Sequence, residues 1–254
     1  MIELEQVTAS YPASSTPVLQ AVTLTIRQHE TLVLLGGSGS GKSTILKTIL
    51  RLLPISEGAI RLDGTDIHAT DAIALRRSIG MVFQGMALFP HLTVAENIGL
   101  PLKLSGMKRA AIRLRVEELL ALVALPPGEF ATRLPHQLSG GQQQRVGVAR
   151  ALAPNPSYLL MDEPFGALDA ITRRSLQDEI KRLRQTLDIT ILFVTHDVME
   201  AVSLGDRLAV MEQGRILQCD TVRRLMAHPT HPSVEKLVSQ PLAELEHFVQ
   251  ASLA

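Results

Sequence analysis

Apolar and polar residues alternate over the first thirty positions, in two stretches separated by a loop at 10–17. A period of two is typical of β-strands that bury one face. The residues on the apolar faces are Ile2, Leu4, Val7, Val22, Leu24 and Ile26. We therefore predict that the chain opens with β-structure.

Continuous apolar runs appear later, and runs of this kind are typical of buried strands in a parallel sheet. They occupy residues 31–35, 79–83, 158–161 and 189–194. A polar or glycine-rich stretch follows each run, and the carboxyl ends of such strands are where α/β sheets place ligand contacts. We also predict a strand at 59–64 and a hairpin that turns at Gln213-Gly214.

Helical spacing dominates residues 88–153. The segment 93–96 is a capping box that opens a helix, and apolar residues recur at helical spacing from Ile112 to Val123. We expect these residues to form a separate helical lobe. A charged helix is predicted at 172–186, and short helices in the tail, 221–254. An apolar stripe in that tail, predicted to pack on the domain, consists of Leu242, Leu245, Val249 and Leu253.

Composition narrows the function classes. The 254 residues suffice for one α/β domain or two lobes, and 25 basic residues balance 25 acidic ones. Zero formal net charge disfavours a nucleic-acid binder. The single cysteine, Cys219, cannot form an intrachain disulfide, which fits a reducing compartment. Without a run of about 18 apolar residues or a signal peptide, the chain is predicted to be soluble and cytoplasmic.

A glycine-rich loop between the strand at 31–35 and an apolar helix has the spacing G-x-x-x-x-G-K-S. The loop consists of Gly36, Gly37, Ser38, Gly39, Ser40, Gly41, Lys42, Ser43 and Thr44. Glycines let backbone N–H groups surround phosphate oxygens, and the helix N-terminus favours the same anion. Lys42 would contact the β- and γ-phosphates and Ser43 would ligate Mg²⁺. The loop predicts a bound nucleoside triphosphate.

Further polar residues follow the other buried strands. Asp162 and Glu163 end one strand, where one carboxylate can hold Mg²⁺ and the other can polarise an attacking water. Gln84 and His196 end two more. A second anion-binding device, formed by Ser139, Gly140, Gly141 and Gln142, starts another helix, although an ordinary helix N-cap is the simpler interpretation of that segment alone. Two phosphate sites on one chain suggest that each chain completes its partner's site.

The ordered set of these motifs resembles the nucleotide-binding subunit of an ABC transporter over nearly the whole chain. The resemblance implies an α/β fold: a P-loop NTPase (RecA-like) core sheet with an N-terminal antiparallel β subdomain and an inserted α-helical subdomain. It places the ATP-binding core at 1–87 and 154–220, the helical subdomain at 88–153 and a helical tail at 221–254, all within one nucleotide-binding domain.

The resemblance also implies a role for each site residue. Tyr11 would stack on adenine, although a loop tyrosine by itself is more often a packing residue. Ser43, Gln84 and Asp162 would coordinate Mg²⁺, and Glu163 would be the general base. His196 would contact the γ-phosphate. Residues 139–142 would close on ATP bound to a second copy of the chain, and Asp169 would link the two sites of that dimer. Both sites should hydrolyse ATP, because no catalytic position departs from the family pattern.

The partners implied by the family are two transmembrane permease subunits and, indirectly, an external substrate-binding protein, with no nucleic acid. The segment 85–93, with Met86, Leu88 and Phe89, would receive a coupling helix of the permease. The resemblance places the chain at the cytoplasmic face of the plasma membrane. The segments 133–150 and 165–173 are most similar to importers of osmoprotectants such as glycine betaine, choline or carnitine.

Two features depart from that subgroup: Cys219-Asp220-Thr221 replaces a usual Gly-Thr, and no appended regulatory domain pair is expected in a chain that ends at Ala254. Importers of other small solutes (amino acids, polyamines or sulfonates) therefore stay open as alternatives. A non-transport ABC ATPase is less favoured, because long coiled-coil inserts and a second cassette are missing. A regulatory sensor would not need Glu163 and His196, and a GTPase would need an N-K-x-D segment.

Overall fold

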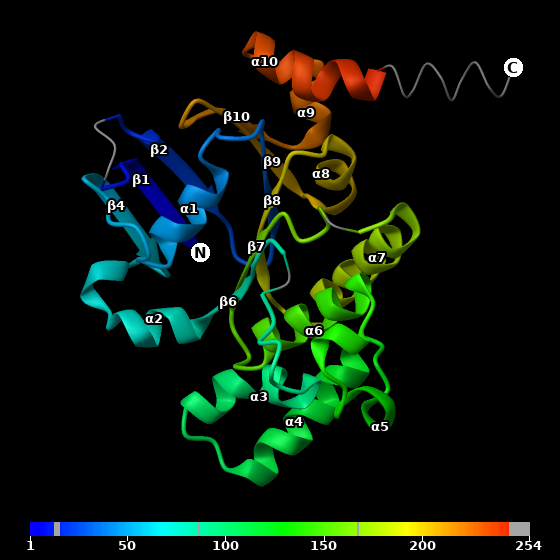
Figure 1. Ribbon diagram of the computed structural model, residues 1–254. Helices are drawn as coiled ribbons and strands as arrows, with labels where there is room; N and C mark the ends of the chain where they lie inside the picture. The colour runs from blue at the N-terminus through cyan, green and yellow to red at the C-terminus, as the bar shows by residue number, and fades with distance from the viewer. Residues whose placement is uncertain (13–15, 86, 167, 244–254) are drawn as a thin grey trace, which may run out of the picture. The chain divides into compact units, whose positions relative to one another are not determined.

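The computed structural model describes residues 1–12, 16–85, 87–166 and 168–243, and Figure 1 shows it as a ribbon. The chain divides into two compact units. The first joins Met1–Ala72 to Leu192–Ala254, and the second is Ile73–Ile191. Met86, Ala167 and the distal part of the predicted tail stripe (Leu245, Val249 and Leu253) lie outside the described residues.

The first unit opens with the predicted β-structure, an antiparallel sheet in the order β2-β1-β4-β5. Its strands are β1 (Ile2–Ala9), β2 (Leu19–Ile26), β4 (Glu57–Leu62) and β5 (Thr65–Asp66). The apolar faces are buried, but the alternation in β1 shifts between Leu4 and Val7. Gln6 has a φ of 49° there, so a bulge inserts one residue and returns Val7 to the buried face.

The same unit holds strands in the order β10-β9-β3-β8. These are β3 (Thr31–Leu35), β8 (Thr190–Thr195, whose first two residues belong to the second unit), β9 (Arg207–Glu212) and β10 (Arg215–Asp220). The β3–β9 pair is parallel, and β9 and β10 form the predicted hairpin. The strand β3 is buried along its whole length, which accounts for its unbroken apolar run.

The helices of the first unit connect or follow these strands (Figure 1). They are α1 (Lys42–Ile49), η1 (Ile67–Ala69), α8 (Val198–Leu204), α9 (Val222–Ala227), α10 (Pro232–Val234) and a π-helical turn η3 (Glu235–Ser239). Short helices in the tail agree with the sequence expectation. Val234, Val238 and Leu242 are buried, so the described part of the tail packs on this unit.

The second unit pairs two parallel strands, β6 (Ile79–Val82) and β7 (Tyr158–Asp162), and is otherwise helical. Its helices are α2 (Ala72–Ser78, whose first residue belongs to the first unit), α3 (Val94–Leu104), α4 (Arg109–Leu122), α5 (Pro127–Phe130), η2 (Pro135–Gln137), α6 (Gly140–Leu152) and α7 (Ala170–Thr186). Helices α3, α4 and α6 pack together, as the green part of Figure 1 shows. The predicted capping box at Thr93 and Glu96 is present.

Across the described part of the chain, no helix combines the length and the apolar character needed to cross a lipid bilayer.

Candidate active site

The predicted phosphate loop lies between β3, which ends at Leu35, and α1, which begins at Lys42. Its first glycine is required by packing, since a Cβ on Gly36 would lie 2.2 Å from the carbonyl oxygen of Met211 in β9. The other side of the loop is open: apart from the adjoining residues of the chain, no described atom comes within 4 Å of the position of a Cβ on Gly37 or Gly39. A backbone loop with one packed and one open side leaves room for a phosphate at the start of a helix.

The charged ammonium group of Lys42 lies within this loop. Its Nζ donates hydrogen bonds of 2.8 Å to the carbonyl oxygens of both Gly36 and Gly37, and the side chain is only 5% exposed. The amide of Ile45, three residues after Lys42, donates a hydrogen bond to the carbonyl oxygen of Gly41 and closes the first turn of α1. The loop therefore surrounds an ammonium group at a helix N-terminus, where both features favour an anion.

Tyr11 lies against α1 in the same unit. Its hydroxyl is 3.4 Å from Oγ1 of Thr44 and accepts a hydrogen bond of 3.2 Å from Nζ of Lys47. The Lys47 ammonium is also 5.4 Å from the centre of the ring. The ring thus lies beside Thr44 of the phosphate loop, and adenine stacking by Tyr11 stays a prediction.

His196 follows β8 directly and is exposed. Its neighbours are held on both sides: Thr195 is buried at the end of the strand, and Asp197 caps α8 by accepting the backbone N–H groups of Met199 and Glu200. The first unit therefore contains the loop 36–44, Tyr11 and His196.

In the second unit, Gln84, Asp162 and Glu163 meet at the carboxyl ends of β6 and β7. The register pairs Val82 with Met161, so the residues that follow the two strands are neighbours. Nε2 of Gln84 lies 3.4 Å from Oε2 of Glu163, and Asp162 is the last residue of β7. An amide and two carboxylates at adjoining strand ends are the oxygen donors that Mg²⁺ prefers, so these side chains fit the ion.

The segment predicted to bind a second anion caps the start of α6. Ser139 is the N-cap: its Oγ accepts the amide of Gln142 at 3.3 Å, and Oε1 of Gln142 accepts the amide of Ser139 at 2.9 Å. The sequence allowed an ordinary N-cap as the simpler interpretation, and the capping box is present. Whether the segment also binds phosphate stays a prediction.

The start of α6 packs tightly on the start of α7. A Cβ on Gly141 would be 2.2 Å from Cγ2 of Thr172, so only glycine fits without a shift of that side chain. Asp169 caps α7 by accepting the amides of Ile171 and Thr172. Hydrogen bonds from the Thr172 hydroxyl and amide are the main reason that the pKa of Asp169 is lowered.

Comparison with known proteins identifies the chain. The family model described as "ABC transporter" matches residues 19–166, which include the phosphate loop, Gln84 and the segment 139–142. This chain belongs to the ABC transporter family. The resemblance stated from the sequence is therefore confirmed.

Several curated relatives of this ABC protein match almost its whole length. It is 46% identical over 94% of the chain to the glycine betaine/carnitine/choline transport ATP-binding protein OpuCA of Bacillus subtilis. It is 45% identical over 99% to the choline transport ATP-binding protein OpuBA of the same organism, and 44% identical over 94% to the osmoprotectant import ATP-binding protein OsmV of Salmonella typhimurium. The chain spans 63 to 64% of the length of these three relatives.

Solved structures confirm the fold. A dimeric ATP-binding cassette in a post-hydrolysis state, bound to ADP and Pi, matches with a TM-score of 0.78 and 36% identity, over 87% of this chain and 98% of that one. A dimeric bacterial ABC transporter cassette matches with a TM-score of 0.77 and 38% identity over the same shares. The predicted α/β P-loop NTPase fold, with its antiparallel sheet and added helices, is therefore confirmed.

A half-buried arginine of this ABC protein, which no sequence motif singles out, joins three segments of the second unit. Arg145 in α6 donates to the carbonyl of Val123 at 2.8 Å and to Oγ of Ser175 in α7 at 3.1 Å. Its Nη1 is also 2.5 Å from Oε2 of Glu179, a side chain only 5% exposed. No local pattern marks this pair, because its members are 34 residues apart in the sequence.

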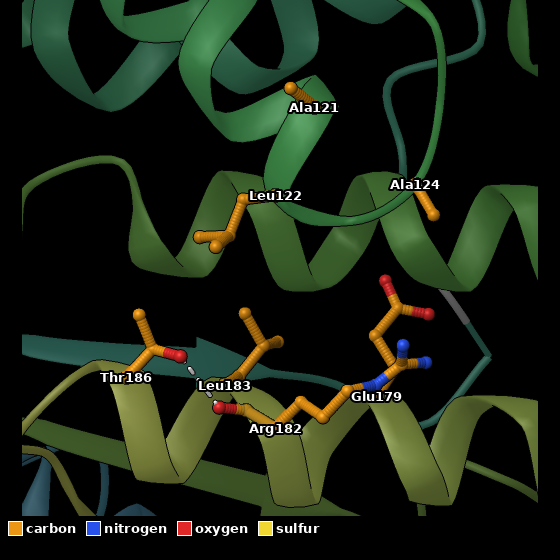
Figure 2. Close-up of a pocket in the computed structure, with 7 residues that line it drawn as sticks. All are labelled: Ala121, Leu122, Ala124, Glu179, Arg182, Leu183 and Thr186. Carbon is orange, nitrogen blue, oxygen red and sulfur yellow. Dashed lines mark hydrogen bonds between the residues drawn. The ribbon is translucent and has the colours of Figure 1, made fainter.

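Glu179 also lines a pocket of about 210 Å³ between the end of α4 and α7, shown in Figure 2. The other residues that line it are Ala121, Leu122, Ala124, Arg182, Leu183 and Thr186. Burial raises the pKa of Glu179 to about 7, against the lowering effect of the charges on Arg145 and Arg182. The pocket contains none of the predicted nucleotide-binding residues, so it is separate from the candidate active site.

Proposed function

We propose that this chain is the ATP-hydrolysing subunit that energises an ABC importer, with osmoprotectants or other quaternary amines such as glycine betaine or choline as the transported solutes. The similarity to OpuCA, OpuBA and OsmV over at least 94% of the chain is the observation that carries this proposal, because those names specify such solutes.

In the proposed reaction, Lys42 and the amides of residues 36–44 hold the phosphates, and Tyr11 stacks on adenine. Glu163 takes a proton from water as the water oxygen bonds to the γ-phosphorus and the bond to the ADP oxygen breaks. His196 contacts the γ-phosphate and helps to position that water. Ser43, Gln84 and Asp162 would hold Mg²⁺, which neutralises phosphate charge when it is bound.

The proposed assembly contains two copies of the chain. Residues 139–142 of one copy would contact the γ-phosphate held by the other, and Asp169 would link the two sites. The dimeric form named for both structural neighbours supports this arrangement. ATP bound between the copies would favour closure, and loss of the γ-phosphate would favour opening, because only the bound triphosphate contacts both copies. Two permease subunits and, indirectly, an external binding protein would complete the transporter, with the chain at the cytoplasmic face of the membrane.

A polyamine importer is the second candidate. The spermidine/putrescine import ATP-binding protein PotA of Pseudomonas fluorescens is also 46% identical, over 87% of the chain. This match is shorter than the matches to the osmoprotectant relatives, so polyamines come second.

The decisive test compares wild type with Glu163→Gln in cells that contain the cognate permease and binding protein. We expect the substitution to abolish ATP hydrolysis by the purified chain, by at least about a hundredfold, and to abolish uptake of labelled glycine betaine after osmotic upshift. Glu117→Gln, on the exposed side of α4, is the matched control and should leave both unchanged.

Uptake of labelled choline and spermidine in the same strains separates the solute classes. Loss of spermidine uptake with normal glycine betaine uptake would overturn the osmoprotectant assignment while leaving the ATPase assignment intact. A purified Glu163→Gln chain that hydrolyses ATP at the wild-type rate would overturn the role of Glu163 as base.

A further inference from the structure

The turn that carries His196 is closed by a buried hydrogen-bond relay. Oγ1 of Thr195, at the end of β8, donates to Oε2 of Glu200 in α8 at 2.6 Å. The same Oγ1 accepts the backbone N–H of Asp197 at 3.0 Å. His196 is thus the single residue between Thr195 and Asp197, which this hydrogen bond joins. Thr195 is 2% exposed and Glu200 is 5% exposed, so water competes poorly for these bonds.

This relay differs from an ordinary capping box. Asp197 is the N-cap of α8 and Glu200 is the third residue of the helix, so the usual arrangement would have Glu200 accept the N–H of Asp197. Here the Thr195 hydroxyl oxygen accepts that N–H, and the hydroxyl donates a hydrogen bond to Glu200. The extra hydroxyl ties the last residue of the strand to the first turn of the helix, across His196.

The bond to Glu200 is the shorter of the two bonds that the Thr195 hydroxyl makes. A separation of 2.6 Å lies within the range of well-formed O–H···O hydrogen bonds. Asp197 adds two more constraints, since its Oδ1 accepts the amides of Met199 at 2.7 Å and Glu200 at 3.2 Å. The backbone on both sides of the exposed histidine is therefore fixed by buried or half-buried polar groups.

We infer that Glu200, acting through the hydroxyl of Thr195, is a positioning residue that holds His196 in place for ATP hydrolysis. The inference rests on the proposed function, because it requires His196 to contact the γ-phosphate. Glu200 itself touches neither nucleotide nor water in this scheme. Its effect is on the orientation of the backbone that presents the imidazole, and a misplacement of about 1 Å at a reacting centre can reduce a rate by up to a hundredfold.

The test uses Thr195→Val, which keeps the side-chain shape and removes the hydroxyl, and Thr195→Ser, which keeps the hydroxyl. For Thr195→Val we expect about a tenfold lower kcat for ATP hydrolysis, with the KM for ATP changed less than twofold. Thr195→Ser should recover most of that loss. Thr190→Val removes a buried hydroxyl at the opposite end of β8 and serves as the matched control, with kcat near that of wild type.

Glu200→Gln and Glu200→Ala test the acceptor of the hydrogen bond from Thr195, as the Thr195 variants test its donor. Glutamine still accepts the hydroxyl but lacks the charge, so its kcat should lie between those of wild type and alanine. In a His196→Ala background, Thr195→Val should have no further effect on single-turnover hydrolysis, because the residue that it positions is gone. Should Glu200→Ala fail to fold, the two Thr195 variants still decide the question.

Wild-type kcat in Thr195→Val, an equal loss in Thr195→Ser, or a full additional loss in the His196→Ala background would each overturn the inference. Failure of the proposed function is distinguishable: the wild-type chain would then not hydrolyse ATP, or His196→Ala would hydrolyse it normally.

Discussion

At the residue scale, the contact between Gly141 and Thr172 shows how one side chain restricts its neighbour. The predicted phosphate-contacting segment begins α6, and the Thr172 methyl group occupies the space that any Cβ at position 141 would need. The Thr172 hydroxyl has a separate task, because it hydrogen-bonds to Asp169 and helps to lower the pKa of that carboxyl.

Because the methyl group and the hydroxyl of Thr172 have separate contacts, the effect of the methyl group on packing can be tested alone. Gly141→Ala should destabilise the chain by about 1–3 kcal/mol, since the methyl group of Thr172 must move. Adding Thr172→Ser removes that methyl group and keeps the hydroxyl, so the double variant should regain most of the loss. Urea unfolding of the four proteins in the double-mutant cycle measures the coupling. Purely additive effects would show that the two residues are not in contact.

At the element scale, the contact between Arg145 and Glu179 joins helix α6 to helix α7. Arg145 lies one turn beyond Gly141, and Ser175 and Glu179 lie one and two turns beyond Thr172, so the contacts continue along the same pair of helices. The two segments proposed to face the partner copy, 139–142 and Asp169, begin these helices. Their relative position is therefore set by the buried contacts behind them.

The raised pKa of Glu179 predicts a pH dependence of stability. The folded chain holds a proton on this group up to about pH 7, whereas the unfolded chain releases it near the ordinary value of 4.5. The unfolded state therefore binds fewer protons between those values, and the stabilisation is greatest below pH 4.5 and declines as pH rises to 7. The decline should be on the order of 1–3 kcal/mol.

Urea unfolding from pH 5 to 8 tests this prediction against Glu179→Gln, which cannot titrate at that position. The wild-type free energy of unfolding should fall relative to that of the variant as pH rises, and the difference should level off above pH 7. Glu118→Gln, in an exposed ion pair with Arg115, is the control and should follow the wild-type curve. A difference that grows in favour of wild type with rising pH would contradict the burial argument.

At the scale of the whole molecule, the functional segments are divided between the two compact units of the chain. The phosphate loop, Tyr11 and His196 belong to the first, whereas Gln84, Asp162, Glu163, residues 139–142 and Asp169 belong to the second. Under the proposed function, hydrolysis requires both units and a second copy. A variant that lacks only the proposed base should therefore still form the dimer, so dimer formation can be measured without hydrolysis.

Glu163→Gln should retain ATP and keep the dimer closed, because it removes the proposed base but none of the groups that bind phosphate. With Mg²⁺ and ATP, its mass in analytical ultracentrifugation should be twice the 27.7 kDa of one chain, and without nucleotide it should be that of the monomer. Adding Lys42→Ala should prevent the dimer by removing the buried cation of the loop. A monomer in saturating ATP would contradict the proposed arrangement.

The sequence alone determined the features that depend on neighbouring residues. The strand, glycine-rich loop and helix at 31–49, the cap at Thr93 and the hairpin at Gln213-Gly214 are set by local spacing and backbone preference, and each lies where the pattern predicted it. The family resemblance also came from such local motifs. The bulge at Gln6 could not be predicted from local spacing, because its effect on Val7 depends on the pairing of β1 with β2.

Tertiary structure alone decided the groups that support the candidate site. Arg145 is an ordinary helical arginine in the sequence, and it joins two helices only because α7 places Ser175 and Glu179 against it. Glu200 occupies a capping-box position in the sequence, but it accepts the Thr195 hydroxyl instead of the Asp197 N–H because of the path of the chain between β8 and α8. A local pattern specifies which residues can cap or bind, but burial and the geometry of neighbouring elements determine which partner each polar group receives.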